Sequence, residues 1–411
     1  MSTKLNIGLF GFGCVGQGLY EVLNQSTLLD AEIAKIVVKN RNKKRLLPED
    51  SFDYESDVII DNPAINVVVE LIDDAEAAYD IVVNALKKGK HVVSANKKLI
   101  ATHLNELILL AQENNVSFLY EAAVCASIPI IRNLEEYYNN DSLSGLEGIC
   151  NGTTNYILSQ SNEGKDYKTS LKEAQELGFA ESDPTLDVDG FDSKFKLQLL
   201  IKHTFGVTTS PDDIFNYGIR QIKPQDIQFA LEKGLRVKLI SRAEKVGNKI
   251  VGFVASHFIK ADHQVYNVAN EFNAVVVEAL FSDKQLFVGK GAGSHPTASA
   301  VLSDISALQF DYKYEYKRSQ LEDKLAFSDD FKVKIYLGAT RFEAMNKVSF
   351  ISEDELYQSA SYSYKTGVVN FSQLSQINFN AESEFFFAVL PAPLEPSKRL
   401  KWSINKREPY M

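Results

Sequence analysis

Carboxylates and lysines are the residues of this sequence whose types and spacing best suit acid–base chemistry. Five carboxylates fall within twelve residues that end at Asp192, and Lys196 follows four residues later. We expect Asp192 to be the N-cap or a first-turn acid of a helix, which places Lys196 one turn along the same face. Such a pair can bind a zwitterionic substrate or hold a lysine for proton transfer. The alternative is a capped surface helix with an ordinary ion pair.

A second lysine follows a strand-like segment. Lys97 comes just after the apolar run His91–Ser94. Ligands of open parallel sheets bind at the carboxyl ends of strands, so Lys97 is a candidate for contact with a ligand. An ordinary loop cation is the alternative. Small residues after Tyr120 are compatible with backbone carbonyls that coordinate a hard monovalent cation, although ordinary tight packing is the commoner explanation of such residues.

Cys150 raises a rival chemistry, because a cysteine nucleophile can form a thioester with an aldehyde. The six histidines show no arrangement that supplies the base it needs. A buried structural cysteine is the commoner case. A cysteine-dependent aldehyde dehydrogenase therefore stays an alternative.

The segment Gly11-Phe12-Gly13-Cys14-Val15-Gly16 fits the pattern G-x-G-x-x-G between a predicted strand and a predicted helix. In that context Gly11 permits a tight turn, Gly13 lets the backbone approach a pyrophosphate, and Gly16 lets helix and strand pack closely. A dinucleotide-binding unit is expected. The second strand is followed by Lys39, Arg41 and further cations where an acid would bind a ribose hydroxyl, which favours NADP(H) over NAD(H). A solvated basic loop is the alternative.

A second glycine-rich loop, Gly289–Thr297, opens into a predicted helix. It is expected either to cover the cofactor from the far side, through Gly291, or to connect two domains.

Valine- and isoleucine-rich strands alternate with helices over the first 130 residues, which predicts a doubly wound α/β domain with a parallel sheet. The predicted strands include Val58–Ile60, and the first helix is predicted from about Val15 to Leu28. After residue 136 helices, one of them over Asp226–Arg236, mix with alternating strands. We divide the chain into a dinucleotide-binding domain (1–135), an α+β catalytic and oligomerisation domain whose end returns to the first (136–311), and a small α+β unit (312–411).

Composition limits the class of protein. The chain has 411 residues, 45% of them hydrophobic, and 54 acidic against 44 basic residues give a net charge of −10. That sign argues against a partner such as nucleic acid or an anionic membrane surface. With three scattered cysteines and no stretch long enough to span a membrane, we expect a cytoplasmic protein.

Taken in order, six segments resemble homoserine dehydrogenase over about residues 5–310. They are Gly11–Gly16, Ala95–Lys98, Tyr120–Pro129, Gly152–Leu158, Gly178–Lys196 and Gly289–Thr297. The resemblance implies a Rossmann-type fold and the reversible oxidation of L-homoserine to L-aspartate 4-semialdehyde with NAD(P)+, in the biosynthesis of threonine, methionine and isoleucine. It also implies a homodimer or homotetramer.

The family's functional positions fall on residues of this chain. The resemblance implies catalytic roles for Lys196, Lys97 and Asp192, and substrate contacts from Glu181, Asp187 and Thr153. It implies cofactor contacts from Gly11, Phe12, Gly13, Cys14, Val15, Gly16, Lys39, Arg41, Lys97 and Gly291, and a sodium-like ion at Glu121, Val124, Ala126 and Ile128.

Two departures accompany the resemblance. Ala126-Ser127 stands where the family usually has two glycines, although carbonyl ligands do not require glycine. The residues after about 320 lack the Asp-Lys-Pro-Gly signature of the regulatory domain of many bacterial relatives, and their pattern fits at most a divergent ACT-like module. A catalytically inactive NADP(H)-sensing protein is the remaining alternative.

Overall fold

The computed structural model describes residues 4–321, 325–377, 379 and 384–397. Its first sheet is parallel, with strand order β2-β1-β3-β4-β5. The strands are Leu5–Phe10 (β1), Ala31–Val37 (β2), Val67–Glu70 (β3), His91–Ser94 (β4) and Phe118–Leu119 (β5). Helices Cys14–Gln25 (α1), Asp57–Ile60 (α2), Ala75–Lys87 (α3) and Lys97–Glu113 (α4) connect them. The doubly wound α/β prediction is confirmed.

Two local predictions in this part are wrong. Val58–Ile60 belongs to the short helix α2 and not to a strand, because Ile59 packs against β1 at Gly8, where a Cβ would lie 2.3 Å from its side chain. Tertiary packing thus overrides the strand preference of branched residues. Helix α1 ends at Gln25, and Leu28 beyond it is exposed.

A mixed sheet of twelve strands forms the rest of the molecule, with the main order β11-β10-β6-β8-β9-β16-β13-β15-β14. The strands of its first part are Leu143–Ile149 (β6), Phe215–Asn216 (β7), Arg236–Val246 (β8), Lys249–Ile259 (β9), Phe272–Ala279 (β10) and Asp283–Lys290 (β11). The helices packed with them are Ile131–Glu135 (α5), Gly152–Asn162 (α6), Tyr167–Glu176 (α7), Thr185–Val188 (α8), Phe191–Phe205 (α9), Pro224–Glu232 (α10) and Ser294–Leu308 (α11).

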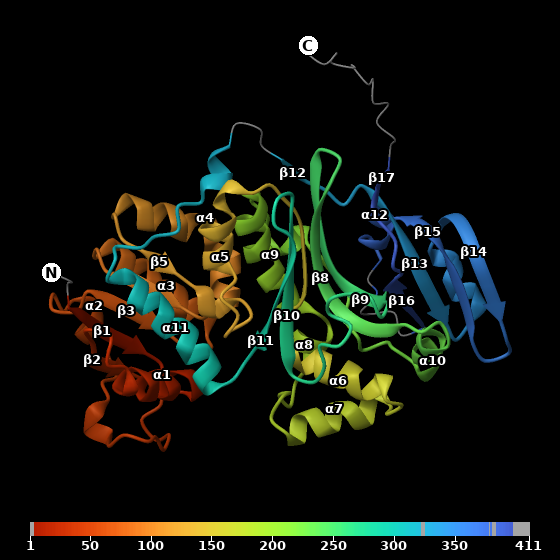
Figure 1. Cartoon of the computed structure of the whole chain (residues 1–411). Helices are drawn as coiled ribbons and strands as arrows, with labels where there is room; N and C mark the ends of the chain where they lie inside the picture. The colour runs from red at the N-terminus through yellow and green to blue at the C-terminus, as the bar shows by residue number, and fades with distance from the viewer. Residues whose placement is uncertain (1–3, 322–324, 378, 380–383, 398–411) are drawn as a thin grey trace, which may run out of the picture.

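The last part of the chain extends this sheet. It contributes Ala326–Phe327 (β12), Phe331–Ala339 (β13), Phe350–Gln358 (β14), Ser363–Asn370 (β15), Phe385–Val389 (β16), Glu395–Pro396 (β17) and helix Phe371–Leu374 (α12). The junction is the pairing of β16 with β9, at Val389 and His257. Figure 1 shows the tail strands in blue, beside the long green strands β8 and β9.

The predicted tail strands around Phe331–Leu337 and Glu384–Leu390 are confirmed. The helix predicted over Asp226–Arg236 ends at Glu232, because Arg236 already begins β8. Helix α11 returns to the first sheet and packs on α1, where a Cβ on Gly18 would lie 2.4 Å from Ser294 Oγ. The domain boundaries near 135 and 311 remain predictions.

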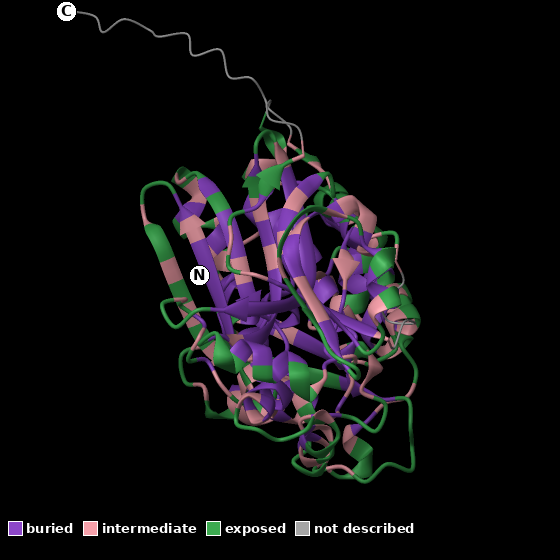
Figure 2. Cartoon of the chain, turned by 90° about the vertical axis from the view of Figure 1, so that its right-hand side faces the viewer, coloured by how far each residue is buried: buried purple, intermediate pink, exposed green. Residues whose placement is uncertain are grey.

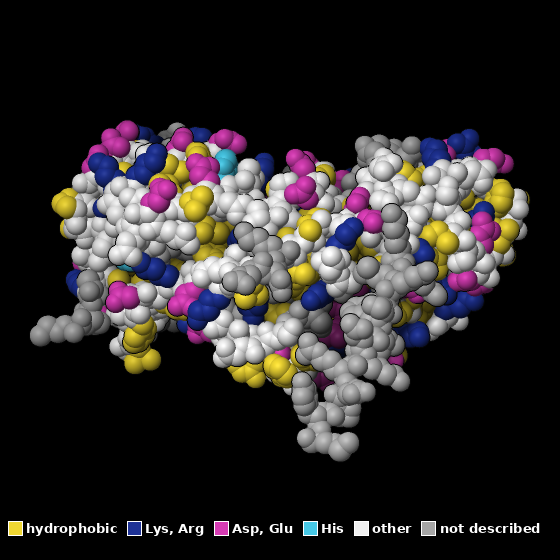
Figure 3. All heavy atoms as spheres, turned by 90° about the horizontal axis from the view of Figure 1, so that it is seen from above, with side chains coloured by type: hydrophobic (Ala, Val, Ile, Leu, Met, Phe, Trp, Pro, Cys, Tyr) yellow, Lys and Arg dark blue, Asp and Glu magenta, His cyan; other side chains and the backbone are white. Residues whose placement is uncertain are grey.

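The strands at the centre of the molecule are buried, whereas loops and outer helices carry most exposed residues (Figure 2). On the face seen from above, basic and acidic side chains are interspersed (Figure 3). Among the described residues, no helix is long and apolar enough to cross a membrane.

Candidate active site

A cavity of about 510 Å³ brings together residues that lie nearly 200 positions apart. Seven of the predicted site residues line it: Lys97, Thr153, Glu181, Asp187, Asp192, Lys196 and Gly291. They come from the start of α4, the start of α6, the segment around α8, the first two turns of α9 and the loop before α11. The structure thus brings these seven residues together around one cavity, and their roles in a site stay predictions.

Lys97 is the first residue of α4, directly after β4. Asn96 caps this helix by accepting a hydrogen bond from the Leu99 amide, and its side-chain amide donates to the Ile72 carbonyl. Ser94 at the end of β4 donates to the buried Glu70 carboxylate at 2.6 Å. Burial raises the pKa of Glu70 to about 7. These bonds fix the turn from which Lys97 extends.

Asp192 holds both lysines. Its Oδ1 lies 2.9 Å from Lys97 Nζ and its Oδ2 lies 2.8 Å from Lys196 Nζ. Asp192 is in the first turn of α9, as expected, while Gly190 is the N-cap residue with a positive φ of 83°. Gln198, two residues after Lys196, donates to the Ala101 carbonyl of α4 at 2.8 Å. This bond between α9 and α4 keeps the two lysines together.

Lys196 and Asp192 are both buried, and each controls the charge of the other. Burial alone would lower the pKa of Lys196, but the Asp192 carboxylate outweighs burial and holds that pKa above its ordinary value. Burial alone would raise the pKa of Asp192, but the ammonium groups of Lys196 and Lys97 hold it below its ordinary value. Lys196 Nζ also donates to the Cys150 carbonyl at 2.7 Å. Two ammonium groups and one carboxylate are therefore in direct contact, and the further carboxylates of Glu181, Asp187 and Glu271 line the same cavity.

Asn151 connects Asp187 and Asp192 by hydrogen bonds, and the sequence analysis did not single it out. It caps α6 by accepting from the Thr154 amide, while its Nδ2 donates to Asp187 at 2.7 Å and to Asp192 at 3.0 Å. Burial, followed by the charge of Asp192, raises the pKa of Asp187. The only sequence signal for Asn151 is an N-cap residue type directly before the segment Gly152–Asn155.

Thr153 and Glu181 occupy the other side of the cavity. Thr153 Oγ1 donates to the Phe179 carbonyl at 2.5 Å, which leaves its lone pairs to accept from a ligand. Glu181 is exposed in the loop before α8, and the Gln175 side chain donates to its carbonyl at 3.0 Å.

The glycine fingerprint has the predicted geometry. Gly11 has a φ of 93°, and a Cβ on it would lie 2.5 Å from the Leu71 carbonyl oxygen. A Cβ on Gly16 would lie 2.3 Å from the Gly11 carbonyl oxygen, whereas a Cβ on Gly13 would meet nothing within 4 Å. Gly13 is the N-cap of α1, followed by Cys14 and Val15 in its first turn. The open space at a helix N-terminus suits a phosphate group.

The second glycine-rich loop connects this fingerprint with the cavity. Ser294 Oγ donates to the Cys14 carbonyl at 2.7 Å, and Gly291 lines the cavity. A Cβ on Gly291 would lie 2.1 Å from the Asn273 side chain, so only glycine fits there without rearrangement. The position of this loop, between the fingerprint and the cavity, favours the prediction that it lies beside the cofactor.

A basic groove of about 490 Å³ follows β2. Arg41 lines it with its guanidinium 4.2 Å from the Tyr54 ring centroid, and Phe52 of the groove packs against Phe12 of the fingerprint. Lys39 lies outside the groove lining, almost fully exposed, 3.9 Å from Asp74. Phe12 as a whole residue is buried, with 2% of its surface exposed.

The carbonyl cluster predicted for a monovalent ion lies in the turn after β5. Cys125 and Ala126 have φ values of 55° and 43°, both in the left-handed region. The carbonyls of Glu121 and Ile128 each accept one backbone hydrogen bond and keep a second lone pair. The Glu121 side chain accepts from the amides of Ile131 and Arg132 and does not face an ion. Among the described residues no cluster of three or more His, Cys, Asp or Glu is suited to a metal ion.

Cys150 does not line the cavity, and its side chain is buried. Its contribution to the site is the carbonyl that accepts from Lys196. The arrangement gives no support to a cysteine nucleophile.

The chain is similar to known proteins over most of its length. Residues 129–306 match the family model described as homoserine dehydrogenase, and residues 11–121 match the homoserine dehydrogenase NAD-binding domain. A homoserine dehydrogenase of Bacillus subtilis is 35% identical, with 90% of this chain and 94% of that protein covered. One of Lactococcus lactis is 39% identical, with 73% of each chain covered.

Solved structures show the same relationship. The crystal structure of a homoserine dehydrogenase from Thiobacillus denitrificans matches with a TM-score of 0.83 and 31% identity, over 94% of this chain and 98% of that one. A hyperthermophilic archaeal homoserine dehydrogenase in complex with NADPH matches with a TM-score of 0.65 and 26% identity, over 76% of this chain and 99% of that one.

Proposed function

The chain belongs to the homoserine dehydrogenase family of oxidoreductases, and we propose that it catalyses the reversible NAD(P)-dependent oxidation of L-homoserine to L-aspartate 4-semialdehyde. The observation that carries the proposal is the contact of Lys97 and Lys196 with one carboxylate, in a cavity lined by the second glycine-rich loop, which is hydrogen-bonded to the fingerprint through Ser294 and Cys14. Through this reaction the enzyme serves the biosynthesis of threonine, methionine and isoleucine.

Substrate binding is assigned to the acidic side of the cavity. Glu181 and Asp187 supply carboxylates for the ammonium group of the amino acid, and Thr153 supplies a hydroxyl. Asn151 keeps Asp187 and Asp192 at a fixed separation by donating to both. The substrate's side-chain oxygen then faces the two lysines.

Proton transfer is assigned to Lys196 and charge stabilisation to both lysines. When bound, the nicotinamide cofactor accepts or returns the hydride. In the reducing direction the Lys196 ammonium donates a proton to the oxygen that was the aldehyde, while Lys97 stabilises the developing negative charge. In the oxidising direction Lys196 must be neutral before it accepts the hydroxyl proton. Asp192 positions both lysines and stays ionised throughout.

The residues present fit a dinucleotide. The open space at Gly13 suits the pyrophosphate, backbone groups of Phe12, Cys14 and Val15 surround it, and Gly11 and Gly16 shape the turn. We assign the 2′-phosphate of NADP to the basic groove, with Arg41 as the principal contact and Lys39 adding charge from outside it. We assign the contacts with the nicotinamide end of the cofactor to Gly291 and Lys97.

The carbonyls of Glu121, Val124, Ala126 and Ile128 fit a sodium-like ion in type, because a hard cation prefers neutral or anionic oxygen ligands. Carbonyls at a left-handed turn can converge on one point. Such an ion would stabilise the turn that contains Cys125 and Ala126. The same turn is held to β11 by Ser127, whose hydroxyl donates to the Lys290 carbonyl at 3.0 Å.

A spectrophotometric assay tests the function. Purified protein with L-homoserine and NADP+ should generate reduced cofactor, and NAD+ should be the poorer substrate. In the Arg41→Ala variant KM should rise for NADP+ and stay nearly unchanged for NAD+. Cofactor binding without turnover of either pair would reject the enzyme and favour the NADP(H)-sensing alternative.

The oligomer and the compartment complete the proposal. Leu280, Phe281 and Val288 are more than half exposed at β10 and β11, which suits burial between copies in a homodimer or homotetramer built through the middle domain. Sedimentation equilibrium measures the oligomeric state, and a monomer at micromolar concentration would contradict the proposed oligomer.

All three cysteines are unpaired, which suits the reducing cytoplasm.

A further inference from the structure

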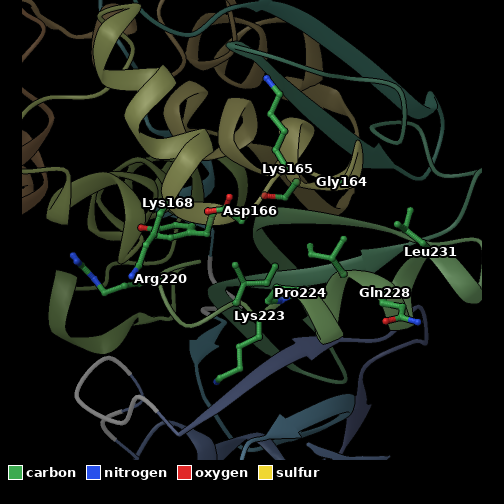
Figure 4. A pocket seen from close by; sticks show the side chains of 13 residues that line it. Gly164, Lys165, Asp166, Lys168, Arg220, Lys223, Pro224, Gln228 and Leu231 are labelled. Carbon is green, nitrogen blue, oxygen red and sulfur yellow. The ribbon is translucent and has the colours of Figure 1, made fainter. Parts of the chain in front are cut away.

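A second cavity of about 510 Å³ lies between the end of α6, the start of α7 and helix α10, and it shares no lining residue with the candidate active site. We call it the α7–α10 cavity. Figure 4 shows it from close by. Its volume is in the range of small-molecule sites. Neither substrate nor cofactor contacts are assigned to it.

One wall of the α7–α10 cavity is apolar. Ile222, Pro224, Ile227 and Leu231 form this wall, and Leu231 is 48% exposed at its rim. Tyr167 also lines the cavity, and its hydroxyl is buried without a hydrogen-bond partner. Burial raises the pKa of Tyr167 to about 12, so the hydroxyl stays a neutral donor. A buried donor without a partner is costly, and an acceptor from a ligand would satisfy it.

The polar lining includes four cations, Lys165, Lys168, Arg220 and Lys223. Lys165 is paired with Glu173 at 2.7 Å and Arg220 with Asp189 at 2.8 Å. Lys168 and Arg220 lie toward one end in Figure 4, with Gln228 and Leu231 toward the other. Within the described part of the chain Lys168 forms no ion pair, and Nη1 of Arg220 makes no hydrogen bond. The one acid, Asp166, is already occupied, because it caps α7 and accepts from both the amide and the hydroxyl of Thr169.

Arg220 connects the α7–α10 cavity with the candidate active site. Its Nε and Nη2 donate to Asp189 at 2.8 and 3.0 Å, and its Nη2 also donates to Thr185 Oγ1 at 3.2 Å. Thr185 begins α8 and Asp189 follows its end, so Arg220 clamps the helix that carries Asp187. A ligand that binds Arg220 would therefore weaken its hydrogen bonds to Asp189 and Thr185 and change the position of Asp187 between them.

We propose that the α7–α10 cavity binds a small monocarboxylate with an apolar body, and that this ligand alters the affinity of the active site for its amino-acid substrate through Arg220 and α8. The carboxylate lies toward Arg220 and Lys168, and the apolar body lies against the α10 wall. The effect on substrate affinity rests on the proposed function; the binding itself does not.

Isothermal titration calorimetry with 4-phenylbutyrate on the full chain tests the binding. We expect saturable one-site binding with a Kd of about 1 mM, typical of a fragment-sized ligand. The uncharged 4-phenylbutanol and the short butyrate should each bind at least tenfold more weakly. Equal binding of 4-phenylbutanol would show that no cationic recognition exists and would overturn the proposal.

Matched variants locate the site. Leu231→Glu places an anion at the rim and should weaken 4-phenylbutyrate binding at least tenfold. Leu109→Glu, at a leucine of α4 that is 58% exposed and does not line the cavity, should leave it unchanged. Lys168→Ala should weaken it about threefold. Equal losses in both leucine variants, or no binding to the unmodified chain, would reject the cavity as the site.

Kinetics test the coupling. Saturating 4-phenylbutyrate should raise KM for L-homoserine at least threefold in the unmodified chain and in Leu109→Glu, with no change in Leu231→Glu. An unchanged KM in an active enzyme that binds the probe would overturn the coupling. An inactive protein would reject the proposed function, while the calorimetric comparison would still decide on the cavity.

Discussion

At the level of single residues, the two lysines differ in how completely the protein surrounds them. Lys196 is buried and donates to both Asp192 and the Cys150 carbonyl, whereas the Lys97 side chain is 41% exposed and contacts Asp192 alone. A fixed ammonium group suits directed proton transfer, and a more exposed one suits electrostatic stabilisation. The proposed division of roles follows from this difference.

Replacement of Lys196 tests that division. Lys196→Ala should lower kcat by about 10²- to 10⁴-fold, the usual contribution of a positioned proton-transfer group. Cofactor binding, followed by fluorescence of the reduced cofactor, should change little because no residue of the Gly11–Gly16 fingerprint lines the cavity that holds Lys196. Lys194→Ala on the same helix lies outside the cavity lining and is the control. Retained turnover in Lys196→Ala would remove this residue from catalysis.

The direction of the reaction should determine its pH dependence. Because Asp192 holds the pKa of Lys196 above its ordinary value, the ammonium form persists to alkaline pH. Oxidation needs the neutral amine, so its kcat should rise steadily with pH up to the limit of protein stability. Reduction needs the ammonium form and should show no such rise. Parallel pH profiles for the two directions would contradict the assignment.

At the scale of elements, the three fingerprint glycines serve different purposes. Gly16 is required by packing, because a side chain would collide with the Gly11 carbonyl, while Gly13 has open space and an ordinary φ of −87°. The position of each glycine in the G-x-G-x-x-G pattern predicts this division. The structure supplies the contacts behind it.

Two alanine variants test this distinction. Gly16→Ala should lower the free energy of unfolding by about 1–3 kcal/mol, as for other overpacked sites. Gly13→Ala should leave stability within about 0.5 kcal/mol, because a methyl group meets no protein atom there. Its Kd for NADP+ should nevertheless rise at least tenfold, since the methyl group occupies the pyrophosphate approach. Urea unfolding and fluorescence titration measure both quantities, and normal NADP+ affinity in Gly13→Ala would contradict the phosphate assignment.

How far the sequence predicts the structure also depends on scale. Residue types and one strand end made Lys97 and Lys196 separate candidates, because ligands bind at the carboxyl edge of a parallel sheet and a carboxylate–lysine pair suits proton transfer. Only the family resemblance placed Lys97, Asp187 and Lys196 in one site. Contacts between distant segments could not be predicted from the sequence. Examples are the hydrogen bonds of Asn151 to Asp187 and Asp192, and the hydrogen bond from Gln198 to α4. Val58–Ile60 shows the same limit, since its helix depends on packing against β1.

At the scale of the whole molecule, the family resemblance read from six motifs is confirmed by both family models and by relatives over most of the chain. The tail was the least predictable part. Its strands were expected, but their pairing with β9 through β16 depends on residues more than 100 positions apart. The tail consequently shares a sheet with the strands beneath the candidate active site.

A buried acid fastens the tail to α10. Asp226 accepts hydrogen bonds from the hydroxyls of Tyr336 in β13 and Tyr362 just before β15, and from the Lys223 amide. Burial raises the pKa of Asp226 to about 6, well above the value of about 3.9 for an unfolded chain. The folded state therefore favours the protonated form. This contribution to stability is complete below about pH 4 and is lost as pH rises through 6.

The Asp226→Asn variant isolates this effect, because an amide does not titrate. Between pH 5 and pH 8 the free energy of unfolding of the unmodified chain should fall by about 1.4 kcal/mol relative to Asp226→Asn, the linkage expected for one group with these two pKa values. Tyr336→Phe keeps the acid but removes a donor to its charged form, so its decline over the same range should be steeper. Urea unfolding at several pH values measures all three chains. Parallel curves for the unmodified chain and Asp226→Asn would show that the carboxyl group is already ionised at pH 5, and that the tail is fastened by a charged group and not by a neutral one.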